Sequence, residues 1–474
     1  MTTVEESVTE TREDIPLKKG KKLRNWYSCN EDSFSGFRFV IVAFGSLTCV
    51  ITVALLLQIY YGDYQIIPHG SVSTDSLECS KIGTSILKQG GNAVDAAIAS
   101  AFCLAVTTPH VTGLDAEGQL LIYNHRTRLP PNVIDFTGSL TVPENIPRLV
   151  LGLAYVHQQY GSLAWKDLVQ PAADLAERGY LISKLLVEAV TKSKAEDLYG
   201  RLEAGQILKH ENLSISLYKI ANIAEDELYT YIQQKQPVLS QALKFTFSNY
   251  DIYIPNAPLI GPSLISNLKE IEKFNFTKVD SIKPEYVYRL VEMTQNTYAE
   301  QNIKDRFHEG TSSNVAVVDL NDYYVSLVTG MYGLFGSGEM TTHGYVLDVP
   351  NKDKPCSRIP LIITDGNFIC GRRMVLGANN FATATQLVAT LLIAEKNVTE
   401  GIESPRFHIL GNETIGVEDH LPAFGEDVLE YMKTLSPDIQ PISEPYPSSN
   451  IVEKTKDELS SHSDSRGGGI ASRF

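Results

Sequence analysis

The longest apolar stretch of the chain runs from Phe39 to Tyr61 and contains no charged residue. About 20 apolar residues in a helix cross the hydrocarbon core of a bilayer, so this stretch predicts a membrane-spanning helix. A buried core helix and a cleaved signal peptide are the alternatives, but the stretch is long and begins late for a signal peptide.

The basic residues around this stretch predict its orientation. Five Lys or Arg residues lie between positions 19 and 38, whereas none lies between 62 and 80. The positive-inside rule therefore predicts a cytoplasmic tail at 1–38, a transmembrane helix at 39–61 and a remainder outside the cell or in the lumen. This is the topology of a single-pass type II membrane protein of the plasma membrane or the secretory pathway.

Beyond residue 62, helical and strand-like patterns are mixed. A helical pattern covers 77–106 and is interrupted at Gly90-Gly91; its second half is small and apolar on nearly every side, which is typical of a buried helix. Further helices are predicted at 152–160, 168–177, 264–274, 284–300 and 382–394, and strands at 120–123, 133–136, 314–318, 323–328, 344–347, 361–364 and 374–376. The turn Asp319–Asp322 predicts a hairpin. Because no βαβ rhythm is visible, an α+β layered fold is favoured over a Rossmann sheet.

Composition and charge narrow the function. The chain has 474 residues, of which 43% are hydrophobic, and this is enough for a large globular core. Its net charge of −15 argues against nucleic acid as a partner, because binding phosphates needs clustered Lys and Arg. Four N-x-S/T sequons all follow the predicted span, which fits a glycosylated ectodomain; they begin at Asn212, Asn275, Asn397 and Asn412.

Four of the six cysteines lie in the predicted ectodomain: Cys79, Cys103, Cys356 and Cys370. An even number in an oxidising compartment suggests disulfides, although the sequence alone leaves the pairing open. No CxxC spacing occurs, so a zinc site is not expected. Nothing in the sequence implies another metal or an organic cofactor.

Six sequence blocks occur in order from about residue 70 to the C-terminus. They are Cys79–His110 with its Gly-Gly-Asn-Ala-Val-Asp-Ala-Ala core, Val133-Ile-Asp-Phe136, Gly152–Ala173, Val317–Gly338, Glu403-Ser-Pro-Arg-Phe-His408 and Ser465-Arg-Gly-Gly-Gly469. Together they resemble the gamma-glutamyltransferase (glutathione hydrolase) family. The Thr-Ser-Ser-Asn segment at 311–314 and Gly377-Ala-Asn379 resemble its gamma-glutamyltransferase 7 branch most.

The resemblance implies an Ntn-hydrolase αββα sandwich and a precursor that cuts itself. The pieces would be a heavy-chain-like region, 62–310, and a light-chain-like region, 311–474. In this family the new N-terminal hydroxyl residue attacks the γ-glutamyl amide of glutathione or another γ-glutamyl compound. Water or an amino acid then accepts the acyl group. An alcohol is a weak nucleophile, and the freed α-amine beside it can act as its base.

The resemblance also assigns individual residues. Gly310-Thr311 resembles the cleavage site, whereas counting back from Val317 places Ser312 in the nucleophile position, so both Thr311 and Ser312 are candidates. Asp353 and Ser357 stand where the family binds the donor. Cys79 and Cys103 match a family disulfide between two helical segments.

Several positions depart from the family pattern. Thr137-Gly-Ser139 stands where the family has an Arg that binds the donor carboxylate. The segment that corresponds to the family's glycine loop contains Asp115 and Glu117. Asn380-Phe381 replaces the family's Gly-Gly pair, which binds the oxyanion. The cations expected nearest as substitutes are Lys352, Arg358, Arg372 and Arg373. Two hypotheses follow: an active glutathione hydrolase and γ-glutamyl transferase, or a catalytically inactive relative that serves as a membrane-tethered interaction domain with an unknown protein partner.

Overall fold

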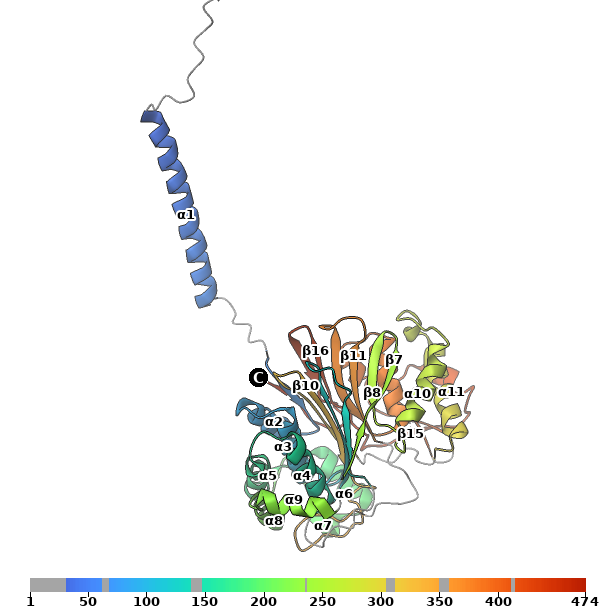
Figure 1. The fold of residues 1–474 in the computed structure, drawn as a ribbon. Helices are drawn as coiled ribbons and strands as arrows, with labels where there is room; N and C mark the ends of the chain where they lie inside the picture. Colours follow the sequence, from blue (N-terminus) through green and yellow to red (C-terminus); the bar gives the residue numbers. More distant parts are fainter. Residues whose placement is uncertain are drawn as a thin grey trace, which may run out of the picture. The chain divides into compact units, whose positions relative to one another are not determined.

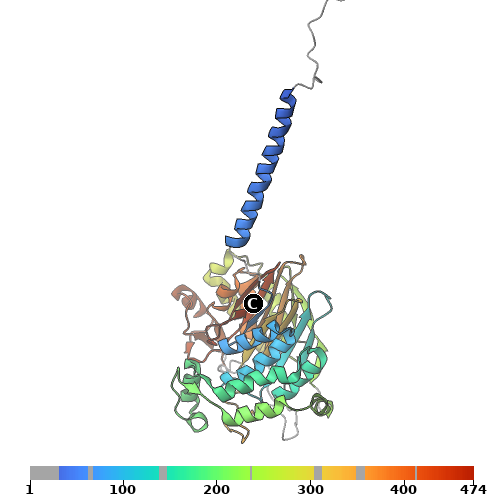
Figure 2. The same cartoon turned by 90° about the vertical axis from the view of Figure 1, so that its left-hand side faces the viewer.

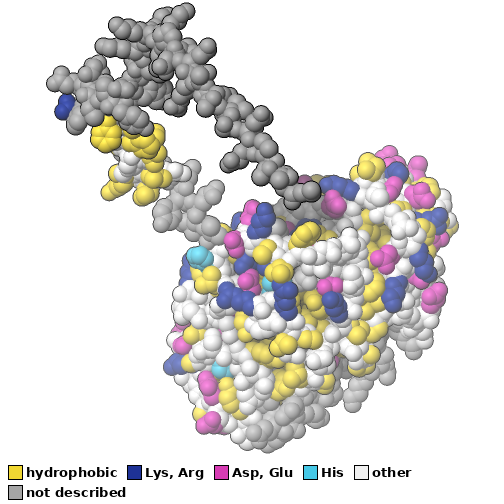
Figure 3. All heavy atoms as spheres, turned by 45° about the horizontal axis from the view of Figure 1, so that its top comes forward, with side chains coloured by type: hydrophobic (Ala, Val, Ile, Leu, Met, Phe, Trp, Pro, Cys, Tyr) yellow, Lys and Arg dark blue, Asp and Glu magenta, His cyan; other side chains and the backbone are white. Residues whose placement is uncertain are grey.

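The computed structural model describes residues 31–61, 68–137, 147–234, 237–303, 312–348, 358–410 and 414–474. The chain forms two compact units, Met1–Ile66 and Ile67–Phe474. The described part of the first unit is one helix, α1 (Glu31–Tyr61), which extends the predicted span toward the N-terminus (Figure 1). Its segment Gly36–Tyr60 is long and apolar enough to cross a membrane, and none of it is buried. Hydrophobic side chains cover the visible face of α1 (Figure 3), which is compatible with a single-pass anchor.

The second unit is built on two antiparallel sheets (Figure 1). In the described residues, the first sheet has the order β18 (Ser472–Arg473), β1 (Ser71–Ser73), β9 (Ser313–Val318), β10 (Tyr323–Gly330), β2 (Glu117–Asn124), β3 (Asn132–Asp135) and β6 (Val238–Gln241). The second has the order β17 (Glu458–His462), β16 (Ile451–Thr455), β12 (Arg372–Ala378), β11 (Ile359–Asp365), β8 (Tyr250–Ile254) and β7 (Leu243–Phe247). A buried apolar cluster that includes Leu121, Val318 and Val375 joins the two sheets.

Helices cover the outer face of each sheet. Three helices pack on the first sheet, namely α2 (Leu77–Lys88), α3 (Ala93–Thr107) and α4 (Arg148–Tyr160), and α5 (Trp165–Arg178) packs on α3 and α8 (Glu211–Ala221) on α5 within the same largest apolar cluster. Figure 2 looks onto this helical layer. The second sheet is covered by α10 (Gly261–Glu272), α11 (Pro284–Glu300), α12 (Phe381–Leu392) and α13 (Val398–Ile402). The layer order is therefore α-β-β-α, as predicted.

Smaller elements connect these layers. They are α6 (Lys184–Ser193), α7 (Glu196–Tyr199), α9 (Glu225–Gln234), α14 (Glu426–Met432), the 3-10 turn Asp280–Ile282, the pair β4 (Tyr180–Leu181) and β5 (Ile207–Leu208), and the three-stranded sheet of β13 (Phe407–Ile409), β14 (Ile415–Glu418) and β15 (Ile439–Ile442).

The buried helix predicted after Gly90-Gly91 is α3, and every residue in it is buried. It begins with a capping box in which Asn92 accepts from the amides of Val94 and Asp95 while Asp95 accepts from the amide of Asn92. The predicted Cys79–Cys103 disulfide is present and joins α2 to α3. Cys370 is free and exposed, and Cys356 lies outside the described residues.

The predicted helices and the 314–328 hairpin are confirmed, with bounds that differ by a few residues. The strand predicted at 344–347 is wrong. Only an isolated bridge joins Met340 to Val346, because Gly344 has a φ of +84° and turns the chain. The apolar residues there pack against Met331 and Ala116 instead of entering a sheet.

The strand registers define two ends of the sandwich. Ser313 pairs with Thr329, and Ser71 pairs with Val318, so β9 begins at the end where β1 and β10 finish. At this end β12 also finishes, because Asn379, which follows its last residue Ala378, accepts a hydrogen bond from Ser312. We call it the Ser312 end; the opposite end, with the turn Asp319–Asp322, is called the turn end.

Candidate active site

Ser312 lies directly before β9 and is 3% exposed. Its Oγ donates a hydrogen bond of 2.7 Å to Oδ1 of Asn379, which follows β12 in the other sheet. This contact places a hydroxyl between the two sheets at the Ser312 end. Thr311, Asp353 and Ser357 lie outside the described residues, so of the four candidates the structure describes Ser312 alone.

A buried polar network fixes the first residues of β9. Ser313 Oγ donates to Oδ2 of Asp75, which follows β1. Asn450, which precedes β16, donates a hydrogen bond from Nδ2 to Oδ1 of Asp75 at 2.7 Å. Its backbone carbonyl accepts a hydrogen bond from Nδ2 of Asn314 at 3.1 Å. Burial raises the pKa of Asp75. Two separate segments thus hold the first residues of β9, next to Ser312, and sequence reasoning missed Asp75 and Asn450 because neither lies in a recognisable catalytic pattern.

The N-terminus of α12 lies beside the Ser312–Asn379 pair. Asn380 is its N-cap, and its Oδ1 accepts from the amide of Thr383 at 2.8 Å. Asn380 has a φ of −149°, which any residue adopts, so this position needs no glycine. The first-turn amides of a helix carry partial positive charge, which suits them to stabilise an oxyanion near Ser312.

A cluster of five charged side chains also lies at this end. Arg148, the first residue of α4, is 3% exposed and contacts Asp348 at 3.4 Å, Asp115 at 3.5 Å and Glu117 at 3.9 Å. Glu117 in turn binds Arg358 at 2.6 Å, and Arg358 also donates to the carbonyl of Met331. Burial raises the pKa of Asp348. We call Arg148, Arg358, Asp115, Glu117 and Asp348 the ion cluster.

The register places the ion cluster near Ser312. Thr329 lies between Ser313 on β9 and Gly118 on β2, and Gly330 pairs with Glu117. The position one residue before Ser313 is therefore in line with Gly330 and Glu117. Strands are about 4.8 Å apart, so Glu117 lies roughly 10 Å from the backbone of Ser312. Of the expected substitute cations that the structure describes, Arg358 is therefore the one that lies at the Ser312 end.

Two of the other expected substitute cations, Arg372 and Arg373, are wrong. Arg372 and Arg373 begin β12, whereas Asn379 follows its last residue, so both lie at the turn end. Arg372 binds Glu453 and two carbonyls of the α12–α13 region, and Arg373 donates to the carbonyl of Lys456. Seven residues of strand separate them from the Ser312 end by about 20 Å. Lys352 lies outside the described residues.

Three sequon asparagines are described, and all are exposed: Asn212, Asn275 and Asn397. Asn397 also caps α13, accepting from the amide of Glu400 at 2.9 Å. Asn412 lies outside the described residues. Their glycosylation stays a prediction. No group of three or more His, Cys, Asp or Glu side chains able to hold a metal ion occurs in the described part of the chain.

Comparison with known proteins finds similar sequences and a similar fold. The gamma-glutamyltranspeptidase family model matches residues 79–146 and 137–235. The chain is 24% identical over 527 residues to human glutathione hydrolase 7, a match that covers 86% of this chain and 78% of that protein, and 25% identical over 530 residues to the rat protein, with the same coverage. The crystal structure of cephalosporin acylase from Bacillus halodurans shares the fold, with a TM-score of 0.69 at 16% identity over 86% of this chain and 96% of that one. The chain therefore matches the gamma-glutamyltranspeptidase family model over part of its length, has glutathione hydrolase 7 proteins among its relatives, and shares the fold of that cephalosporin acylase.

Proposed function

We propose that this protein is a membrane-anchored glutathione hydrolase and γ-glutamyl transferase, and that Ser312 becomes its nucleophile when the bond after Thr311 is cut. The observation that carries the proposal is the buried Ser312 hydroxyl, which lies at the start of β9 against Asn379 and the N-terminus of α12. The similarity to glutathione hydrolases over most of the chain supports the substrate class.

The chemistry follows from these positions. After cleavage, the free α-amine of Ser312 takes the proton from its own Oγ, and the Oγ attacks the carbonyl carbon of the γ-glutamyl amide. The first-turn amides of α12 stabilise the oxyanion, and the amine product leaves with the proton. Water or an amino acid then attacks the ester carbonyl and releases the γ-glutamyl group from Ser312. Asn379 orients the hydroxyl by accepting its hydrogen bond.

Ser312 is preferred to Thr311 because of its contacts. Its Oγ has a partner in the opposite sheet, and the next residue, Ser313, is held by Asp75. In this proposal residues 1–38 are cytoplasmic, 39–61 span the membrane, the heavy-chain-like piece ends at Thr311, and the light-chain-like piece begins at Ser312. The described α1 supports the anchor by its length and apolar composition.

The test is a denaturing gel of full-length, C-terminally tagged and deglycosylated protein, followed by N-terminal sequencing of the tagged band. We expect a fragment that contains residues 312–474 and begins with Ser312. Ser312→Ala should remain uncut, whereas Thr311→Ala, the matched control, should still be cut. Wild-type protein should also hydrolyse a γ-glutamyl anilide. A fragment beginning at Thr311 would overturn the assignment of the nucleophile, and a single band near 52.4 kDa would overturn the whole catalytic route.

A second candidate, an inactive membrane-tethered interaction domain, is favoured by the ion cluster. Arg148 and Arg358 are two described cations near Ser312, and both are already bound to Asp115, Glu117 or Asp348. A donor carboxylate would have to displace these acids, and breaking a buried ion pair is costly. Cleavage and γ-glutamyl anilide turnover of the wild-type protein distinguish the two candidates. A folded wild-type protein that is neither cut nor active on the anilide supports the inactive form.

A further inference from the structure

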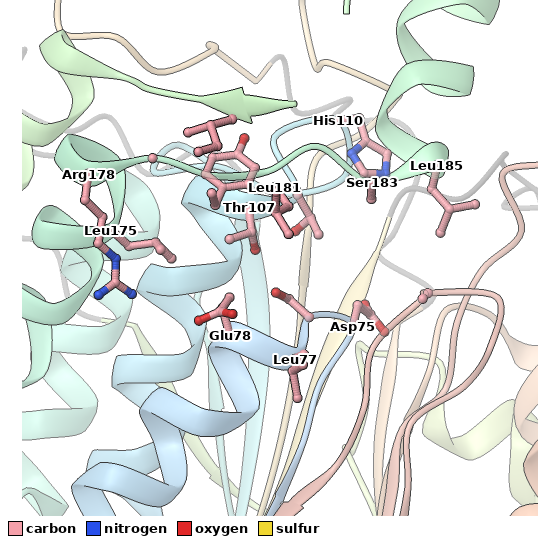
Figure 4. A pocket seen from close by; sticks show the side chains of 17 residues that line it. Asp75, Leu77, Glu78, Thr107, His110, Leu175, Arg178, Leu181, Ser183 and Leu185 are labelled. Atoms are coloured by element: carbon pink, nitrogen blue, oxygen red, sulfur yellow. The ribbon is translucent and has the colours of Figure 1, made fainter. Parts of the chain in front are cut away.

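A cavity of about 510 Å³ lies between the beginning of α2, the end of α3, the end of α5 and the glycine-rich C-terminal segment (Figure 4). Small-molecule sites commonly measure about 300–1,000 Å³, so its size suits a small ligand. Ser312 does not line it. Asp75 forms part of the wall toward β9, and its two carboxylate oxygens are already bound by Asn450 and Ser313. The cavity is therefore separate from the reacting hydroxyl.

His110 supplies the first sign of a ligand. It lines the cavity, is 3% exposed, and its Nδ1 has no hydrogen-bond partner among the described residues. Burial lowers the pKa of His110 to about 4, so the ring is neutral at pH 7. A buried polar atom without a partner costs free energy, and a polar group of a ligand in the cavity would remove that cost.

A pair of oppositely charged side chains is the second indication of a ligand. Glu78, in the first turn of α2, and Arg178, in the last turn of α5, both line the cavity. Figure 4 shows their side chains on the same side of it, with His110 across from them. Within the described part of the chain, neither forms an ion pair. A carboxylate and a guanidinium that share one cavity match a ligand with both an ammonium group and a carboxylate.

Part of the remaining wall is apolar. Leu175 and Leu185 line it together with Leu181, which is itself 68% exposed, so a hydrophobic side chain of a ligand would contact apolar surface on one side. We propose that this cavity is a second ligand site, separate from Ser312, for a small zwitterion, namely an amino acid or dipeptide with an apolar side chain. Glu78 binds the ammonium group and Arg178 binds the carboxylate.

The Cys79–Cys103 disulfide fits this role. Cys79 directly follows Glu78, and Cys103 lies one helical turn before Thr107, another residue that lines the cavity. The bond thus fixes two walls of the cavity relative to each other before a ligand arrives. A preformed site loses less entropy on binding than one that must be assembled.

Equilibrium dialysis of isotopically labelled leucylglycine against the full-length protein in detergent tests the proposal. The Ser312→Ala background is used, so that no covalent turnover of the probe can occur. We expect saturable binding, and we expect Glu78→Gln and Arg178→Gln each to weaken it about 10-fold, which corresponds to about 1.4 kcal/mol. Glu272→Gln, an exposed glutamate at the end of α10, is the matched control and should leave binding unchanged. N-acetyl-leucylglycine, which lacks the ammonium group, should compete about 10-fold less well than leucylglycine.

The absence of saturable binding to folded protein would overturn the proposal, as would an affinity that both Glu78→Gln and Arg178→Gln leave unchanged. Far-ultraviolet circular dichroism establishes folding for each variant. The binding expectation does not depend on cleavage or turnover, so a wild-type protein that proves uncut and inactive leaves this proposal standing. Conversely, an active enzyme that fails to bind the dipeptide refutes this proposal alone.

Discussion

Ser312 and Asn379 are 67 positions apart in the chain, yet Ser312 Oγ donates to Asn379 Oδ1 across the two sheets at 2.7 Å. Asn379→Ala removes the acceptor that orients this hydroxyl. We expect kcat for a γ-glutamyl anilide to fall about 5-fold with little change in KM, because one hydrogen bond is worth about 1 kcal/mol. Asn367→Ala, an exposed asparagine in the turn after β11, is the control. An unchanged kcat for Asn379→Ala would contradict the proposed role.

Gly152 of α4 lies against the ring of Phe136. A Cβ at position 152 would approach the ring to 2.5 Å, which is too close for any side-chain contact. Gly152→Ala should therefore lower the free energy of unfolding by about 1–3 kcal/mol, since overpacking forces α4 away from β3. Urea unfolding measures the change. Gly333→Ala, where no atom lies within 4 Å of the added Cβ, should have little effect.

The Cys79–Cys103 disulfide closes a loop of 24 residues between α2 and α3. Replacing both cysteines by alanine should cost about 3 kcal/mol of unfolding free energy, mainly because the unfolded chain regains conformational freedom. Denaturant unfolding under non-reducing conditions checks this expectation. Cys370→Ala serves as the control because Cys370 is free and exposed. Equal midpoints for the double variant and the control would show that the bond contributes nothing to stability.

Glu403 receives hydrogen bonds from His462 at 2.6 Å and from the amide of Ser465 at 3.0 Å. Burial raises its pKa, but the bonds from His462 and Ser465 outweigh that effect and lower the pKa of Glu403 to about 2. A carboxyl with a lowered pKa stabilises the fold above its unfolded value near 4.5 and loses this contribution as the pH falls toward 2.

Wild type and Glu403→Gln should therefore differ in stability at pH 6, and the difference should shrink steadily between pH 4.5 and pH 2. Denaturant unfolding across this range measures it. Glu400→Gln, an exposed neighbour on α13, should show no such trend. A stability difference that is constant with pH would rule out this account.

The sequence predicted most elements because their cause is local. The apolar character of α3, the Asp319–Asp322 turn and the long apolar run of α1 are all visible within short windows. The site could not be predicted in this way, because it is formed by contacts between residues far apart in the sequence. Asn450, for example, contacts Asn314, 136 positions away. Arg372 and Arg373 were misplaced for the same reason, since sequence spacing does not tell which end of a strand faces the nucleophile. The ion cluster likewise gathers residues from separate segments of the chain.

The strand order also determines what becomes of the two pieces if the chain is cut before Ser312. In the first sheet, β1 lies between β18 and β9, and in the second sheet β8 pairs with β11, so strands from the two sides of the cut are paired with each other in both sheets. No covalent bond is then needed to keep the C-terminal piece attached to the anchored one. Retention at a membrane consequently says nothing about whether the cut has occurred, whereas shedding of the C-terminal piece would signal that both sheets have come apart.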